Sequence, residues 1–298
     1  MKLLTLGVEL EAVAEGYDAR DRIAKAITNG PHPATAKVSD DGPSTGETSW
    51  IIAKDYSIAP GREAFTRRME GVELISPVFT DADTVTRLTW HSEICDVLGS
   101  VCSTVLLRTN ESTGYHVHIG IGKAPGQTFT LDELKKIAVI TILYEKAIDE
   151  LHPAHRSAGH GITNTMLRSN RSNLFFVDYE TSEVLEHILS ARDVKQLTCM
   201  MNPALDDLLD SDNKPMNYMR DYKVNFVSVS KYGTIEFRQH EGTIDPAVVC
   251  AWADFLLALI RYAMELSAKT MITLDPTNMP LVDIVGKDVY APLMLCGQ

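Results

Sequence analysis

The sequence predicts an α+β fold built on a largely antiparallel β-sheet. Short extended segments recur along the chain, helices of different length separate them, and two neighbouring segments lie close enough to form a hairpin. The chain has 298 residues, of which 45% are hydrophobic and 23% charged, so it can bury one sizeable core. There is no internal repeat, and we expect a single domain over residues 1–298.

Seven segments have the length and residue types of strands, and the last two form the expected hairpin around Lys231–Gly233. They lie at 3–12, 50–58, 70–79, 113–121, 172–178, 222–230 and 232–240. Three helices are expected. One covers 81–98, a second follows a capping box of Thr130 and Glu133, and a third begins at Asp245 and Pro246.

A long polar loop is expected at 29–49. Gly, Pro, Ser, Thr and Asp dominate the stretch NGPHPATAKVSDDGPSTGETS, and it shows no apolar period. Most connections without secondary structure are shorter than this one. The loop is therefore expected to be either a lid over a ligand or a surface insertion.

The charge balance limits the partners. The chain carries 28 basic and 40 acidic residues, so its net charge is −12, and such a surface repels nucleic acids and anionic membranes. The most apolar segment, Val248–Ile260, is interrupted by Asp254, and Glu9 and Glu11 come too early for a signal peptide. Five widely spaced cysteines without a CxxC fit reduced thiols. We expect a soluble, cytoplasmic protein.

Acidic and histidine side chains recur at alternate positions of the expected strands. Alternate residues of a strand share one face of the sheet, so each set points to a common side. The sets are Glu9 with Glu11, Asp55 with Ser57, Glu73, His116 with His118, and Glu236 with Arg238 and His240.

These polar faces have two interpretations. On one strand alone, the alternation is typical of a solvated face and needs no function. Five such strands favour bound cations, because crowded carboxylates repel one another. Carboxylates with one or two imidazoles suit Mg²⁺ or Mn²⁺, while His116 with His118 and a carboxylate also suits a catalytic Zn²⁺. Since the chain lacks both GxxxxGK[ST] and GxGxxG, metal-bridged phosphates near Arg238 are the expected phosphate site.

The motifs resemble those of the amidoligase family. GVELE, a Trp followed by DxS, GVELISP, GYHVHIG, Asn225 before YGTIEFRQHEGTID, and a helix with Trp252 occur in that order over about Gly7–Tyr262. The family belongs with the carboxylate-amine ligases of the glutamine synthetase and glutamate-cysteine ligase superfamily. The resemblance implies a curved antiparallel sheet, a half-barrel, with metals and ATP on its concave face and helices on its convex side.

The resemblance also implies roles for individual residues. Arg238 faces the nucleotide phosphates, and Glu236 and His118 join it as catalytic residues. Tyr56 departs from the family pattern, which often has a small residue there. The implied cofactor-binding residues are Arg238, Arg156, Arg220 and Asn225, and Arg168 is a further arginine implied to contact substrate or phosphate. The implied ligands of two or three Mg²⁺ ions are Glu9, Glu11, Asp55, Glu73, His116 and Glu236.

The function expected from this resemblance is an ATP- and Mg²⁺-dependent ligase that forms an amide through an acyl phosphate. Its substrates would be small-molecule or peptide carboxylates and amines, and association into a homo-oligomer is compatible with the sequence. Two alternatives stay open. One is a metal-dependent amide or ester hydrolase that uses His116 and His118, and the other is a non-catalytic module that binds metal or nucleotide.

Overall fold

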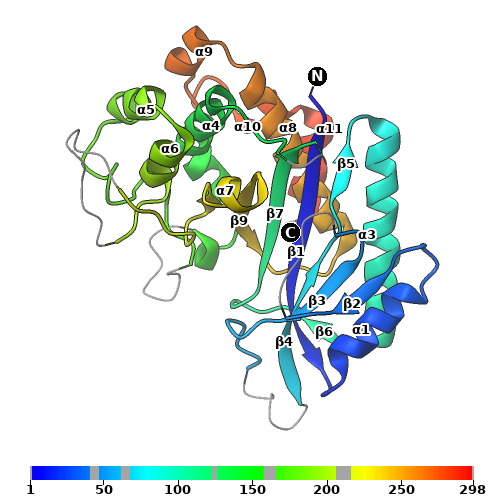
Figure 1. Cartoon of the computed structure of the whole chain (residues 1–298). Coiled ribbons are helices and arrows are strands. Elements are labelled where there is room, and N and C mark those ends of the chain that lie inside the picture. Colours follow the sequence, from blue (N-terminus) through cyan, green and yellow to red (C-terminus); the bar gives the residue numbers. More distant parts are fainter. Residues whose placement is uncertain are drawn as a thin grey trace. The chain divides into compact units, whose positions relative to one another are not determined.

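The computed structural model describes residues 2–40, 47–61, 68–122, 126–157, 166–205 and 216–296. The chain forms two compact units. The first unit comprises Met1–Pro125 and His240–Ala253, and the second comprises Gly126–Gln239 and Asp254–Gln298. Strand β9 (Thr234–Glu241) and helix α8 (Pro246–Glu265) each begin in one unit and end in the other (Figure 1). The expectation of one domain over 1–298 stays a prediction.

The first unit is built around β1 (Leu4–Glu15), and most residues of this strand are buried. Its strands follow the order β2-β3-β4-β1-β7, and β5 and β6 also pair with β1. All pairs made by β1 are antiparallel, as is β3 with β4, whereas β2 pairs with β3 in parallel. The other strands are β2 (Ala36–Val38), β3 (Trp50–Lys54), β4 (Met69–Ile75), β5 (Phe79–Asp81), β6 (Leu107–Arg108) and β7 (Gly114–Ile121).

Two helices of the first unit, α1 (Ala19–Thr28) and α3 (Thr84–Thr104), pack against each other. Asp83 caps the start of α3 by accepting the backbone N–H of Thr86. Behind this cap, the fully buried Asp81 accepts two hydrogen bonds from Arg87 and one from Trp90 Nε1. A buried carboxylate needs such partners, and these fix α3 to the end of β5.

The second unit contains most of the helices and the short pair of β8 (Val224–Asn225) with β9. Its longest complete helix, α4 (Leu131–Asp149), begins at the expected capping box, since Thr130 and Glu133 each accept a backbone N–H from the other. The remaining helices are α5 (Thr181–Ser190), α6 (Val194–Met201), α7 (Ser228–Tyr232), α9 (Ala268–Thr273), α10 (Leu281–Val285) and α11 (Lys287–Cys296) (Figure 1).

The structure confirms mixed α and β elements with an open, mostly antiparallel sheet. The half-barrel and the helices on its convex side stay predictions. Within the described residues, α8 is long and apolar enough to cross a membrane, but 61% of that stretch is buried, which is equally typical of a core helix. The cytoplasmic location also stays a prediction.

Several local predictions were wrong. The segment 172–178 is a series of turns, because the side chain of Asn173 accepts the backbone N–H groups of Phe175 and Phe176 at 2.9 Å. The hairpin at 222–240 has only two paired residues on β8 and the helix α7 in place of a tight turn. The expected loop at 29–49 contains β2, and its residues 41–46 lie outside the described residues.

Candidate active site

The register of the first unit brings the acidic and histidine side chains of three strands onto one face. Glu9 on β1 lies opposite His116 on β7, and Glu11 lies opposite Glu73 on β4. Residues directly opposite each other in an antiparallel pair point to the same side of the sheet. Because β1 has β4 on one side and β7 on the other, the two glutamates of β1 stand at the centre of this face.

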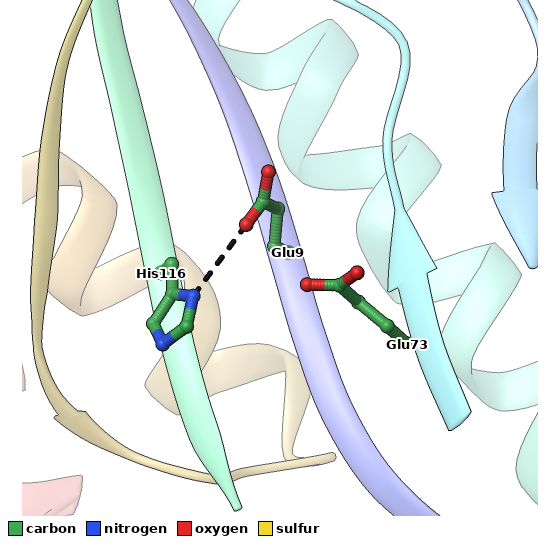
Figure 2. Close-up of side chains that lie close together, drawn as sticks. All are labelled: Glu9, Glu73 and His116. Atoms are coloured by element: carbon green, nitrogen blue, oxygen red, sulfur yellow. Dashed lines mark ion pairs between the residues drawn. The ribbon is translucent and has the colours of Figure 1, made fainter. Parts of the chain in front are cut away.

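Both histidines of β7 contact the carboxylates of β1. The imidazole of His116 lies between two of them, with Nδ1 3.5 Å from Glu9 Oε2 and Nε2 3.6 Å from Glu11 Oε1. His118 Nε2 lies 3.2 Å from Glu9 Oε1. Figure 2 shows Glu73 turned toward the same place from the other side of β1. Glu9, Glu73 and His116 each offer a ligand atom within 4.8 Å of the others.

A second group of three carboxylates adjoins the first. Glu11, Asp55 and Glu73 also offer ligand atoms within 4.8 Å of one another, so Glu73 belongs to both groups. We call Glu9, Glu73 and His116 triad A, and Glu11, Asp55 and Glu73 triad B. Oxygen-rich sets of this kind are suited to Mg²⁺ or Mn²⁺.

Asp55 reaches triad B from a turn and not from a strand, which corrects the expected strand at 50–58. Strand β3 ends at Lys54, and Asp55 Oδ1 then accepts both the backbone N–H and the hydroxyl of Ser57 at 2.7 Å. The Asp-x-Ser spacing therefore makes a local hydrogen-bonded turn. It has the same spacing as two residues on one face of a strand, which explains the wrong prediction.

The pKa values of Glu73 and Glu9 are shifted in opposite directions. Burial raises the pKa of Glu73 well above its usual value, and the neighbouring carboxylates of Glu9, Glu11 and Asp55 raise it further. Burial also acts to raise the pKa of Glu9, but His118 and His116 outweigh it and hold that pKa well below its usual value. The negative charge that crowds Glu73 is the charge that a cation would compensate.

Apolar residues border the acids on the same face. Ala53 lies opposite Glu73, and Ile51 lies opposite Ile75, so the register carries these three apolar side chains next to triad B. Ile51, Ala53 and Ile75 form one buried cluster. Low polarity beside the carboxylates strengthens their attraction for a cation.

In the second unit, the buried Glu236 and the half-buried Arg238 of β9 form an ion pair between Arg238 Nη1 and Glu236 Oε1. The other oxygen, Glu236 Oε2, accepts hydrogen bonds from Asn225 Nδ2 at 2.6 Å and from the hydroxyl of Ser228 at 3.1 Å. Both oxygens of Glu236 are therefore held in place by side chains of its own unit. The predicted metal-binding role of Glu236 and cofactor-binding role of Asn225 stay predictions.

The predicted arginines occupy different environments. Arg156 is buried, and its guanidinium donates to the backbone carbonyls of Arg238 at 2.7 Å and Gln239 at 3.2 Å. Arg156 thus supports the strand that carries Glu236 and Arg238. The side chain of Arg220 is 68% exposed and lies 3.8 Å from Asp221. Arg168 hydrogen-bonds through its backbone to Asp221 and Lys223.

Sequence reasoning missed a buried cation in this unit. Lys223 has no exposed surface, and its ammonium group pairs with Asp149 and, at 3.5 Å, with Glu145. Glu145 and Asp149 are one turn apart on α4, so one lysine reaches both. No local pattern indicates this burial, because the partners on α4 are more than 70 residues away in the sequence.

The sequence of this chain is similar to those of a known protein family. A family profile described as "Putative amidoligase enzyme" matches residues 2–260. A bifunctional glutathione synthetase from Pasteurella multocida aligns with 97% of this chain at 15% sequence identity and a TM-score of 0.35. This chain covers 46% of that structure, or less than half its length, and a similarity so low bears on neither fold nor function. No curated protein matches the sequence.

Proposed function

Because the chain belongs to the family described as putative amidoligase enzyme, we propose that it is an ATP- and Mg²⁺-dependent carboxylate-amine ligase. Family membership supports an enzyme that forms amide bonds. ATP, the metal ions and an acyl-phosphate intermediate are the finer parts of the proposal. Substrates are expected to be small molecules or peptides that present a carboxylate and an amine.

The observation that carries the proposal is the sharing of Glu73 between triads A and B. Two ligand sets with one common carboxylate fit a pair of divalent cations, and a cation pair can hold the phosphates of ATP where no P-loop exists. Bound Mg²⁺ or Mn²⁺ would neutralise negative charge on the transferring phosphoryl group. The raised pKa of Glu73 agrees with this assignment, because burial raises it first and the negative charge of Glu9, Glu11 and Asp55, which a cation would compensate, raises it further.

The proposed reaction has two displacements. An oxygen of the substrate carboxylate attacks the γ-phosphorus of ATP, the bond to the β,γ-bridging oxygen breaks, and ADP leaves. The amine nitrogen then attacks the acyl carbon, the C–O bond to the phosphoryl group breaks, and phosphate leaves with that electron pair. One amine proton passes to a base, and His118, whose Nε2 lies 3.2 Å from Glu9 Oε1, has the carboxylate partner that stabilises an imidazolium.

Residues of the second unit are assigned to the nucleotide phosphates. Arg238 would bind the transferred phosphoryl group, since a guanidinium matches phosphate oxygens in pairs. Glu236 holds Arg238 through their ion pair and is the proposed further ligand of a cation. Arg156 would act through the backbone of β9, which its guanidinium binds. Arg220 and Asn225 complete the proposed nucleotide set.

The direct test is isotope transfer. A panel of acids labelled with ¹⁸O in the carboxylate is incubated with amines, ATP and Mg²⁺, and the products are read by mass spectrometry. We expect amide product, ADP, and one ¹⁸O atom in the released phosphate. Arg238→Lys should lower the rate by about 10²-fold or more, while the exposed Arg192→Lys serves as the matched control. Amide formation without ATP consumption would contradict the proposal.

A hydrolase remains the second candidate because His116 joins two carboxylates in triad A, a ligand set that also accepts Zn²⁺. It predicts a different result in the same experiments. One tightly bound zinc, cleavage of amides or esters without ATP, and ¹⁸O from labelled water in the acid product would establish hydrolysis.

A further inference from the structure

The turn at Asn110–Gly114, which leads into β7, hydrogen-bonds to two segments that supply ligands to triad B. At its end, the backbone N–H of Gly114 donates to Glu11 Oε2 at 2.6 Å. At its start, Asn110 Nδ2 donates to the carbonyl of Ala59 at 2.9 Å, and the hydroxyl of Ser112 accepts the N–H of Ala59 at 2.9 Å. Ala59 ends the short segment that begins with Asp55.

The turn has a defined internal structure. Asn110 Oδ1 accepts the backbone N–H of Ser112 at 2.8 Å and its hydroxyl at 2.6 Å. The carbonyl of Asn110 accepts the N–H of Thr113 at 2.9 Å, and the fully buried Thr113 in turn accepts the N–H of Gly242 at 2.9 Å. The two side chains that contact Ala59 are therefore held by the turn itself.

The segment at 55–59 depends on this support. On its other side it lies against β4, where the N–H of Asp55 donates to the carbonyl of Gly71 at 3.1 Å. This approach requires glycine, because a Cβ at Gly71 would lie 2.7 Å from Ile58 Cβ and closer still to the carbonyl oxygen of Asp55. Asp55 is thus held between the Gly71 backbone and the turn at 110–114.

We propose that Asn110 and Ser112 are positioning residues for a cation at triad B. They fix the segment that carries Asp55, and the same turn fixes Glu11 through Gly114. The inference rests on the proposed function, since it assumes that triads A and B hold cations. The turn holds the segments that carry Glu11 and Asp55, and these two ligands belong to triad B alone, so removal of its side chains should weaken one cation and leave the other.

The test is a titration of the purified full chain with Mn²⁺, in which calorimetry and electron paramagnetic resonance measure the number of sites and their affinities. For wild type we expect at least two sites. In Asn110→Ala/Ser112→Ala, one site should weaken by about 10- to 100-fold, the usual effect of losing support around a ligand. The other site should keep its affinity for Mn²⁺. Asp55→Asn identifies which site belongs to triad B, and Ser103→Ala, an exposed serine on α3, is the matched control.

Two further variants keep the test decisive if the double variant folds poorly. Ser112→Thr retains the hydroxyl and should keep both Mn²⁺ affinities at the wild-type values. Gly71→Ala should displace the Asp55 segment from the opposite side and weaken the site at triad B. Two unchanged sites in the double variant would overturn the inference alone, whatever the result for Gly71→Ala. A wild type that binds no Mn²⁺ would overturn both the inference and the metal-dependent function.

Discussion

At the scale of single residues, Glu73 is the position on which both candidate cation sites depend. It offers a ligand atom to triad A and to triad B, whereas Asp55 serves only triad B. Glu73→Gln should therefore remove most Mn²⁺ binding at both sites, and Asp55→Asn should affect one. Calorimetric titration measures both effects. Glu70→Gln, three pairs along the same β1–β4 ladder and on the opposite face of β4, should leave both sites unchanged.

The raised pKa of Glu73 also makes the stability of the protein depend on pH. A carboxyl group whose pKa is raised by folding stabilises the folded state most at a pH below its usual pKa. This stabilisation is lost as the pH rises through the pKa of the folded state. In metal-free protein at about pH 8, Glu73→Gln should therefore raise Tm by roughly 2–4 °C, the shift expected for about 1 kcal/mol. At about pH 4 the variant and the wild type should melt together. Scanning calorimetry over this range measures the difference, and a lower Tm for the variant at the higher pH would contradict the assignment.

At the scale of elements, the short strand β8 is held by a buried charge. Lys223 enters this strand with its ammonium group between Glu145 and Asp149 of α4. Lys223→Met would leave two carboxylates without their cation, so we expect the free energy of unfolding to fall by about 3 kcal/mol or more. Urea denaturation measures the loss. Lys231→Met on α7, where the lysine is exposed, should change it by less than about 0.5 kcal/mol.

The elements also show what the sequence could predict. The alternation in GVELE and GYHVHIG placed Glu9, Glu11, His116 and His118 correctly in pairs, because a strand has a fixed period of two. The pairing of Glu11 with Glu73 was not predictable from that period, since register depends on contacts distant in sequence. It is this register that makes Glu73 common to both triads.

Other wrong predictions came from sequence patterns that are common to strands and to turns held by a side chain. The apolar run at 174–177 reads as a strand, but the side chain of Asn173 satisfies two backbone N–H groups locally and turns the chain. Asp55 and Ser57 have the spacing of one strand face and also that of a side-chain turn. Lys223 was missed because lysines are rarely buried without partners, and its partners on α4 are far away in the sequence.

At the scale of the whole molecule, the family match covers residues 2–260, and the candidate ligands of triads A and B all lie between Glu9 and His116. The net charge of −12 is therefore not evenly distributed over the chain. A few of the carboxylates are gathered on one face of the first unit. Two divalent cations there would offset four of the twelve excess charges, because each carries two. The acidity that a substrate meets would be lower than the sequence value suggests.

The first unit is interrupted in the sequence, and this affects the order in which it can form. Its segment His240–Ala253 supplies the carbonyl of Val249 to the hydroxyl of Tyr115 at 2.8 Å and the N–H of Gly242 to Thr113. During synthesis on the ribosome, Tyr115 and Thr113 emerge long before those partners, and the whole of Gly126–Gln239 is made in between. Strand β7, with both candidate histidines, therefore gains the Val249 partner of its Tyr115 only after that interval, so the first unit cannot be completed before the segment His240–Ala253 has been made.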